Sequence, residues 1–208
     1  MKFRLSRIAA IVSTMAIAAS ANAALSTYAP WDTAYTANGL NGVLFNVQSA
    51  GGATVALGAH AYKNGAYLPN NGVNTYYAQS GTYAGPPAEA NRANWSFDFG
   101  WNLGTNCLNC SVWLGIDNDP TSAVNLLWGD ITVVPQPESW NLEMPFLAGV
   151  NFDPFSPSST AFSLQVRDAT GSVVVGSDIT VNVPEPGSLA LVGLALGGLA
   201  LARRRRVG

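Results

Sequence analysis

The sequence predicts an all-β protein, an antiparallel β-sandwich or jelly roll, on the basis of three observations. Short runs rich in β-branched and aromatic residues recur through residues 24–182, and clusters of Gly, Asn, Pro and Asp separate them. Apolar residues in this region show no helical periodicity. At least eight such runs fit into its length, which is typical of two antiparallel sheets packed face to face.

The clearest predicted strand is the segment 95–103. Five large apolar side chains alternate there with small or polar ones: Trp95, Phe97, Phe99, Trp101 and Leu103. Because successive side chains of a strand point to opposite faces, these five share one face. Burying each contributes roughly 1.5–3 kcal/mol, so we expect this strand at the centre of the core.

A β-hairpin is expected just before the carboxyl-terminal tail. Apolar and polar residues alternate over 162–167, and the Asp, Ala, Thr and Gly of 168–171 form a turn signal. The return strand begins at 172–175, and alternation resumes over 179–183.

Six further segments have the composition of short strands: 42–47, 53–62, 75–79, 111–116, 126–134 and 139–144. The rest of 63–92 is rich in Gly, Asn, Tyr and Pro, and we expect it to form the least ordered loops of the domain.

The amino end has the pattern of a secretory signal peptide covering residues 1–23. Three basic residues precede an apolar run at 8–19, and Ala21 and Ala23 supply the small residues of a cleavage site. An uncleaved amino-terminal anchor is the alternative, which the shortness of the apolar run disfavours.

The carboxyl end carries an apolar run that four arginines terminate. Residues 187–202 are uncharged and number 16, slightly fewer than the ~17–25 that an α-helix needs to cross a bilayer. The arginines that follow cannot enter apolar lipid and would hold this end on the cytoplasmic side: Arg203, Arg204, Arg205 and Arg206. The rest of the chain is then expected outside.

Val183, Pro184, Glu185 and Pro186 precede the apolar run, and their prolines predict an extended segment accessible to a protease. The order of this peptide, the apolar helix and the arginines resembles the PEP-CTERM sorting tail of Gram-negative exopolysaccharide-producing bacteria. The resemblance implies recognition of Pro184, Glu185 and Pro186 by exosortase, a membrane-embedded protease-transpeptidase. It also implies transient residence in the inner membrane, then delivery to the cell surface or extracellular matrix. An ordinary membrane anchor that is never cleaved is the alternative.

The chain thus divides into a signal peptide at 1–23, an exported domain at 24–182 and a sorting tail at 183–208. The exported domain contains three Lys or Arg against eleven Asp or Glu, a net charge of −8. Nucleic acid and anionic lipid are poor partners for such a surface, because phosphate binding depends on clustered basic residues. Divalent cations, polysaccharide or simple solubility outside the cell are compatible with it.

Cys107 and Cys110 form a C-x-x-C pair, which can be a redox centre, half of a zinc site or a short disulfide. The flanking residues predict a loop between strands, whereas thioredoxin-like chemistry needs a helix start. Zinc needs about four N or S ligands, and His60 is the only other soft donor. In an oxidising compartment we favour a disulfide that closes this loop.

Asp117 and Asp119 flank Asn118 in a loop, with Asp98 and Asp130 not far away in sequence. Alternating oxygen donors suit calcium, but the spacing of an EF-hand is absent. The alternative is an Asx turn before a proline, with no ion. No other cofactor is expected.

Two carboxylates and the single histidine are the candidate catalytic residues. Glu138 and Glu143 resemble the acid pair of a glycosidase only in composition, because a strand would put them on opposite faces. His60 lies on the predicted strand through Val55 and Leu57, and we expect it to be a surface or half-buried residue. No serine nucleophile motif accompanies it.

Four tryptophans outside the central strand could stack sugar rings if they are exposed: Trp31, Trp113, Trp128 and Trp140. Burial in the core is the default for so large an apolar ring, and sequence alone does not separate the two.

The segments 116–120 and 136–141 also resemble, loosely, a turn and a following Trp-Asn segment in exported PEP-CTERM proteins, which implies a sandwich with no assigned activity. We therefore expect a non-enzymatic cell-surface or matrix protein that associates with exopolysaccharide. A carbohydrate-binding module, with or without calcium, is the alternative, and a glycoside hydrolase comes third.

Overall fold

The computed structural model describes residues 24–27, 43–63, 68–85, 92–107, 109–119, 121–147, 149–185 and 187. Nine strands and one 3-10 turn are assigned in these ranges: β1 (Phe45–Ala50), β2 (Ala53–Ala61), β3 (Thr75–Tyr77), β4 (Trp95–Asn102), β5 (Ser111–Asp117), β6 (Leu126–Asp130), β7 (Glu138–Trp140), η2 (Pro145–Leu147), β8 (Ser158–Arg167) and β9 (Val173–Val183). The predicted signal peptide at 1–23 and most of the sorting tail, including its arginines, lie outside the described residues.

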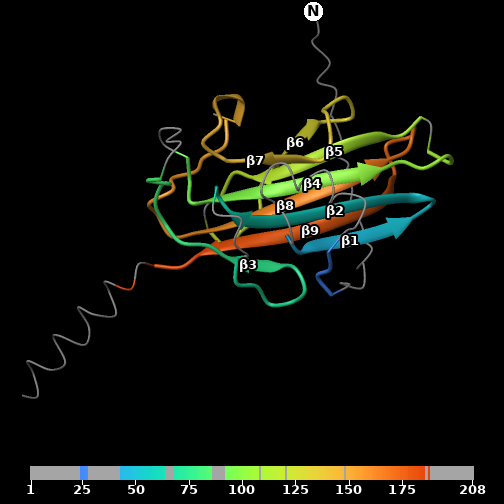
Figure 1. The fold of residues 1–208 in the computed structure, drawn as a ribbon. Helices are drawn as coiled ribbons and strands as arrows, with labels where there is room; N and C mark the ends of the chain where they lie inside the picture. Colours follow the sequence, from blue (N-terminus) through green and yellow to red (C-terminus); the bar gives the residue numbers. More distant parts are fainter. Residues whose placement is uncertain are drawn as a thin grey trace, which may run out of the picture.

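The strands form two sheets, of four strands in the order β1-β2-β4-β7 and of five in the order β3-β9-β8-β5-β6. All neighbours are antiparallel except β3 and β9, which are parallel. Figure 1 shows β2 and β4 in one layer, with β8 and β9 in a layer behind them. This arrangement is consistent with the predicted β-sandwich.

Aromatic side chains of β4 fill the space between the sheets, as its period-2 pattern predicts. Phe97 and Phe99 are fully buried, and Trp95 and Trp101 are nearly so. The Phe97 ring stacks on Phe162 of the other sheet, with 4.4 Å between ring centroids. The predicted central strand is therefore confirmed.

The predicted hairpin is formed by β8 and β9, which pair from Ser158 with Val183 to Arg167 with Val173. Asp168 closes its turn, and Gly171 adopts a φ of 85°, which disfavours any side chain. The return strand β9 is continuous, whereas the sequence pattern indicated two separate runs. The apolar pattern is interrupted at Ser177, a polar residue that is nevertheless buried and points inward. Its hydroxyl donates to the Asn46 carbonyl at 2.7 Å.

The strand predicted at 75–79 ends at Tyr77. Two other predicted strands, 126–134 and 139–144, are also shorter than expected. The first ends at Asp130, because the Asp130 carboxylate accepts from the Thr132 N–H and turns the chain. The second ends at Trp140, because Asn141 Oδ1 accepts from the Ala93 and Glu143 N–H groups at the next position. No helix within the described ranges is long and apolar enough to span a bilayer.

Candidate functional site

The sorting peptide begins where the last strand ends. Val183 is buried and makes the final β9 pair with β8, whereas Pro184 and Glu185 are exposed. Proline lacks an N–H and cannot extend the ladder, so the sheet stops at this point. Figure 1 shows the end of β9 at the margin of the two sheets, beside β3. Pro186 lies outside the described residues, so the structure places two of the three residues predicted for recognition.

Cys107 and Cys110 form a disulfide in the loop between β4 and β5, with their Cα atoms 5.2 Å apart. The Cys107 side chain is buried against the core. The predicted disulfide is thus confirmed, and neither sulfur is available as a thiolate for zinc or for redox chemistry while the bond is intact.

Asp117 holds the turn after β5 through hydrogen bonds to the backbone. Its Oδ1 accepts from the N–H groups of Asp119 and Asn125, at 3.0 and 2.8 Å. Asp119 in turn accepts from the Thr121 N–H at 2.9 Å, and bonds from Thr121 lower the pKa of Asp119 below its ordinary value. This is the Asx-turn alternative of the sequence analysis. In the described ranges no three His, Cys, Asp or Glu side chains are grouped as a metal site would require.

Asp98, which the sequence grouped with these carboxylates, lies against His60 instead. His60 Nδ1 is 2.8 Å from Asp98 Oδ2, and both residues are buried. The expectation of a surface or half-buried histidine was wrong. The pairing requires that β2 and β4 be neighbours, which places Gly58 opposite Asp98 and His60 two residue pairs further along, on the same face. Sequence periodicity gives no such signal.

The negative charge of Asp98 also reaches Tyr76. Burial raises the pKa of Tyr76 far above its ordinary value of 10.0, and the charge of Asp98 adds to the shift. The Tyr76 hydroxyl donates to the Leu44 carbonyl at 2.5 Å. Both groups therefore belong to the buried framework of the domain.

Glu138 and Glu143, the two candidate acids of a glycosidase, lie in different parts of the structure. Glu138 lies on β7, opposite Phe99, and Glu143 follows after the chain has turned. Burial raises the pKa of Glu143; the charge of Asp153 adds to this shift and Arg92 opposes it. The charged neighbours that shift the pKa of Glu143 are thus one carboxylate and one guanidinium.

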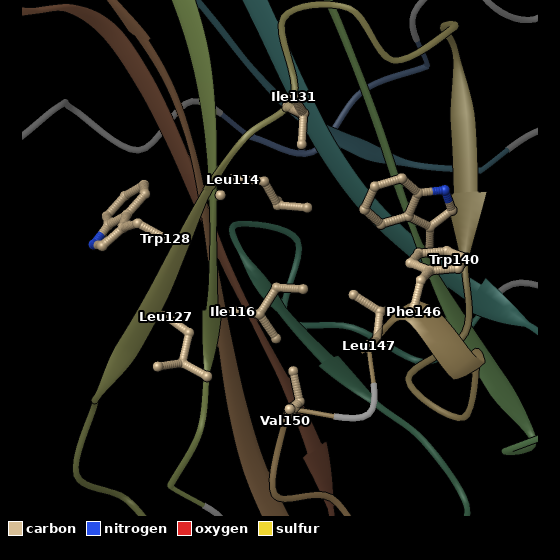
Figure 2. Close-up of a pocket in the computed structure, with 11 residues that line it drawn as sticks. Leu114, Ile116, Leu127, Trp128, Ile131, Trp140, Phe146, Leu147 and Val150 are labelled. Carbon is tan, nitrogen blue, oxygen red and sulfur yellow. The ribbon is translucent and has the colours of Figure 1, made fainter.

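Trp140 lines an apolar pocket between the edge strands β6 and β7, with a volume of about 220 Å³. In Figure 2 Leu114 and Ile116 point from β5 into this space, and Leu147 and Val150 face them. Phe146 packs edge-on against Trp140 and is 63% exposed. Every lining residue is apolar or glycine, so the pocket offers no side chain for acid–base chemistry: Leu114, Ile116, Leu127, Trp128, Gly129, Ile131, Trp140, Phe146, Leu147, Gly149 and Val150.

The other two described tryptophans that the sequence singled out lie on the outer face of the five-stranded sheet. Figure 2 shows the Trp128 indole on the opposite side of β5 from Trp140. The Arg167 guanidinium carbon lies 5.0 Å from the Trp113 ring centroid and 4.6 Å from that of Trp128. Sequence analysis missed Arg167, because β8 and β6 are brought together only by β5 between them. Trp31 lies outside the described residues.

Comparison with known proteins identifies the tail and nothing else. The family model for the PEP-CTERM protein-sorting motif matches residues 182–206. No curated protein and no solved structure matches the chain.

Proposed function

We propose that this chain is a non-enzymatic protein of the cell surface or extracellular matrix. Its residues 182–206 carry the PEP-CTERM protein-sorting motif, which implies an exported protein that an exosortase processes. It associates there with exopolysaccharide after its tail has been removed. The observation that carries the proposal is the position of the motif. It begins with the last two residues of β9, and Pro184 and Glu185 directly after the strand are exposed.

The chemistry of the domain supports a binding or structural role. Two of its carboxylates form hydrogen bonds within the domain: Asp117 accepts from the backbone of a turn, and Asp98 is bonded to His60. The exported region carries a net charge of −8, which favours solubility over attachment to nucleic acid or anionic lipid.

A carbohydrate-binding module is the second candidate. The observation that favours it is Trp128, a residue that is 36% exposed and lies next to an arginine on the outer face of a sheet. Indole rings at such positions offer a flat apolar surface to a sugar ring.

The sorting assignment is tested by replacing Pro184, Glu185 and Pro186 with alanine in the producing cells. The variant is expected to stay in the membrane fraction with an intact mass that retains the four arginines, while the native chain ends near the motif. A control in which exposed Ser122, Val124 and Val133 become alanine is expected to be processed normally. Normal release of the motif variant contradicts the assignment.

A further inference from the structure

We propose that Trp113, Trp128 and Arg167 form a binding site for an acidic polysaccharide, one whose sugar rings carry carboxylates. This inference rests on the proposed function, since it names the surface by which the protein is held in a polysaccharide matrix. We call these three residues the outer-face site.

The outer-face site spans three neighbouring strands. Trp113 on β5 is opposite Gln165 on β8, two residue pairs away from Arg167, and Trp128 on β6 is opposite Gly115. Side chains alternate along β5, and Leu114 points into the core, so Trp113 and Gly115 belong to the other face. All three site residues therefore lie on strands, with Arg167 at the end of β8, where the β8–β9 register shifts.

Gly115 fixes the position of the Trp128 ring. A Cβ atom at Gly115 would lie 3.1 Å from three atoms of the indole six-membered ring, so the ring lies flat over bare backbone. One face of the indole is thus supported by the sheet, and the residue is still 36% exposed.

The other two members are held by hydrogen bonds. Trp113 Nε1 donates to Ser111 Oγ at 2.9 Å. Arg167 donates from Nε and Nη2 to Gln165 Oε1, at 3.0 and 2.8 Å. Because the side chains are ordered before a ligand arrives, binding would cost little of their conformational entropy.

Arg167 keeps its positive charge available. Gln165, which orients it, is neutral, and the ion pair found between described residues is the distant one of His60 with Asp98. Asp130 shares the face, opposite Trp113, but its carboxylate is bonded to Thr132. A cation that has no acidic ion-pair partner among the described residues is suited to a carboxylate supplied from outside.

A carboxylated sugar matches both parts of the outer-face site. The C–H face of a pyranose ring can lie on an indole, and a ring carboxylate can accept two parallel N–H bonds from a guanidinium. A neutral sugar would gain only the stacking contact. An acidic peptide would gain only the ion pair.

The test is titration of the mature protein, recovered from its producing cells, with polygalacturonate and with its methyl ester, which keeps the rings and removes the charge. We expect binding of polygalacturonate at least 10-fold tighter than that of the ester. Arg167→Gln is expected to lose that difference, and Trp128→Ala to weaken binding of both polymers. Phe155→Ala, which removes an aromatic ring that is 64% exposed elsewhere, is the matched control and should bind like the native protein.

Gly115→Ala provides a further variant, which leaves all three side chains of the site in place and displaces the Trp128 ring. It is expected to weaken binding of both polymers, and thermal unfolding checks that each variant is folded. Equal binding of polygalacturonate and its ester, native-like binding by Arg167→Gln, no binding at all, or equal binding of polyglutamate each overturns the inference. If these results occur while the protein is still processed and found at the cell surface, only the inference fails, and the proposed function stands.

Discussion

His60 and Asp98 form a buried pair on the outer face of the four-stranded sheet, with 2.8 Å between Nδ1 and Oδ2. Trp95, Phe97 and Phe99 alternate with Asp98 on β4 and point into the core, so the pair lies on the opposite face. The second carboxylate oxygen, Asp98 Oδ1, is buried and has no hydrogen-bond partner in the described residues. The histidine is therefore the main compensation for burying this carboxylate.

Replacing His60 with leucine should destabilise the domain, because Asp98 then loses its partner while remaining buried. A cost of about 1–3 kcal/mol in the free energy of unfolding is expected from the desolvation of an unsatisfied polar group. Urea unfolding of the two single variants and of His60→Leu/Asp98→Leu measures the coupling. The double variant should be more stable than the sum of the single losses predicts, and simple additivity would show that the pair does not interact.

Loss of the Cys107–Cys110 disulfide is expected to have a modest effect, because the closed loop is short. The loop-entropy relation gives about 2 kcal/mol for a ring of this size. The unreduced exported protein should not react with a thiol probe, and Cys107→Ser/Cys110→Ser should shift the urea midpoint accordingly. Labelling of either cysteine without reductant would contradict the disulfide in the exported protein.

Asp168 makes the β8–β9 turn sensitive to acid. Its carboxylate accepts from the Thr170 hydroxyl and from the Ser172 N–H, and these bonds lower its pKa below the ordinary value of 3.8. A lowered folded-state pKa stabilises the protein above the ordinary value, and this contribution is lost as the pH falls through the folded-state pKa.

Thermal unfolding of the native protein and of Asp168→Ala from pH 7 to pH 2 tests this. The native protein should be more stable at neutral pH, and the difference in Tm should shrink once the pH is below about 3.8. A difference that is the same at all pH values would mean that the carboxylate charge does not act through this turn.

Calcium should not be needed for the stability of the domain. Asp117 Oδ1 already accepts two backbone N–H bonds, and in the absence of an ion these hold the turn. EDTA is expected to leave Tm unchanged, whereas Asp117→Ala should cost about 1–3 kcal/mol by leaving those donors unsatisfied. A rise in Tm with millimolar calcium that Asp117→Ala abolishes would instead establish a calcium site.

The fold was predictable where a local pattern decides it. The alternation through Trp95, Phe97 and Phe99 specifies both a strand and its buried face, and the Asp168 turn joins two further alternating runs. The sorting tail was predictable for a similar reason, because its signal is a contiguous peptide followed by an apolar run.

The contacts between residues of different strands could not be predicted, because they depend on which strands become neighbours. His60 and Asp98 are 38 residues apart, and nothing local to either one indicates that β2 lies beside β4. Arg167 and Trp128 likewise meet across β5. Periodicity tells which face of a strand a residue occupies, but the partner strand is decided by the packing of the whole sandwich.

The position of β9 links the completion of the fold to the presentation of the tail. Although β9 is the last strand of the described residues, it lies inside its sheet, between β3 and β8. In synthesis and in export from the amino end it therefore arrives last, and the five-stranded sheet cannot close before residue 183 has emerged. Pro184 follows at once, so the sorting peptide emerges at the same moment as the domain acquires its missing strand.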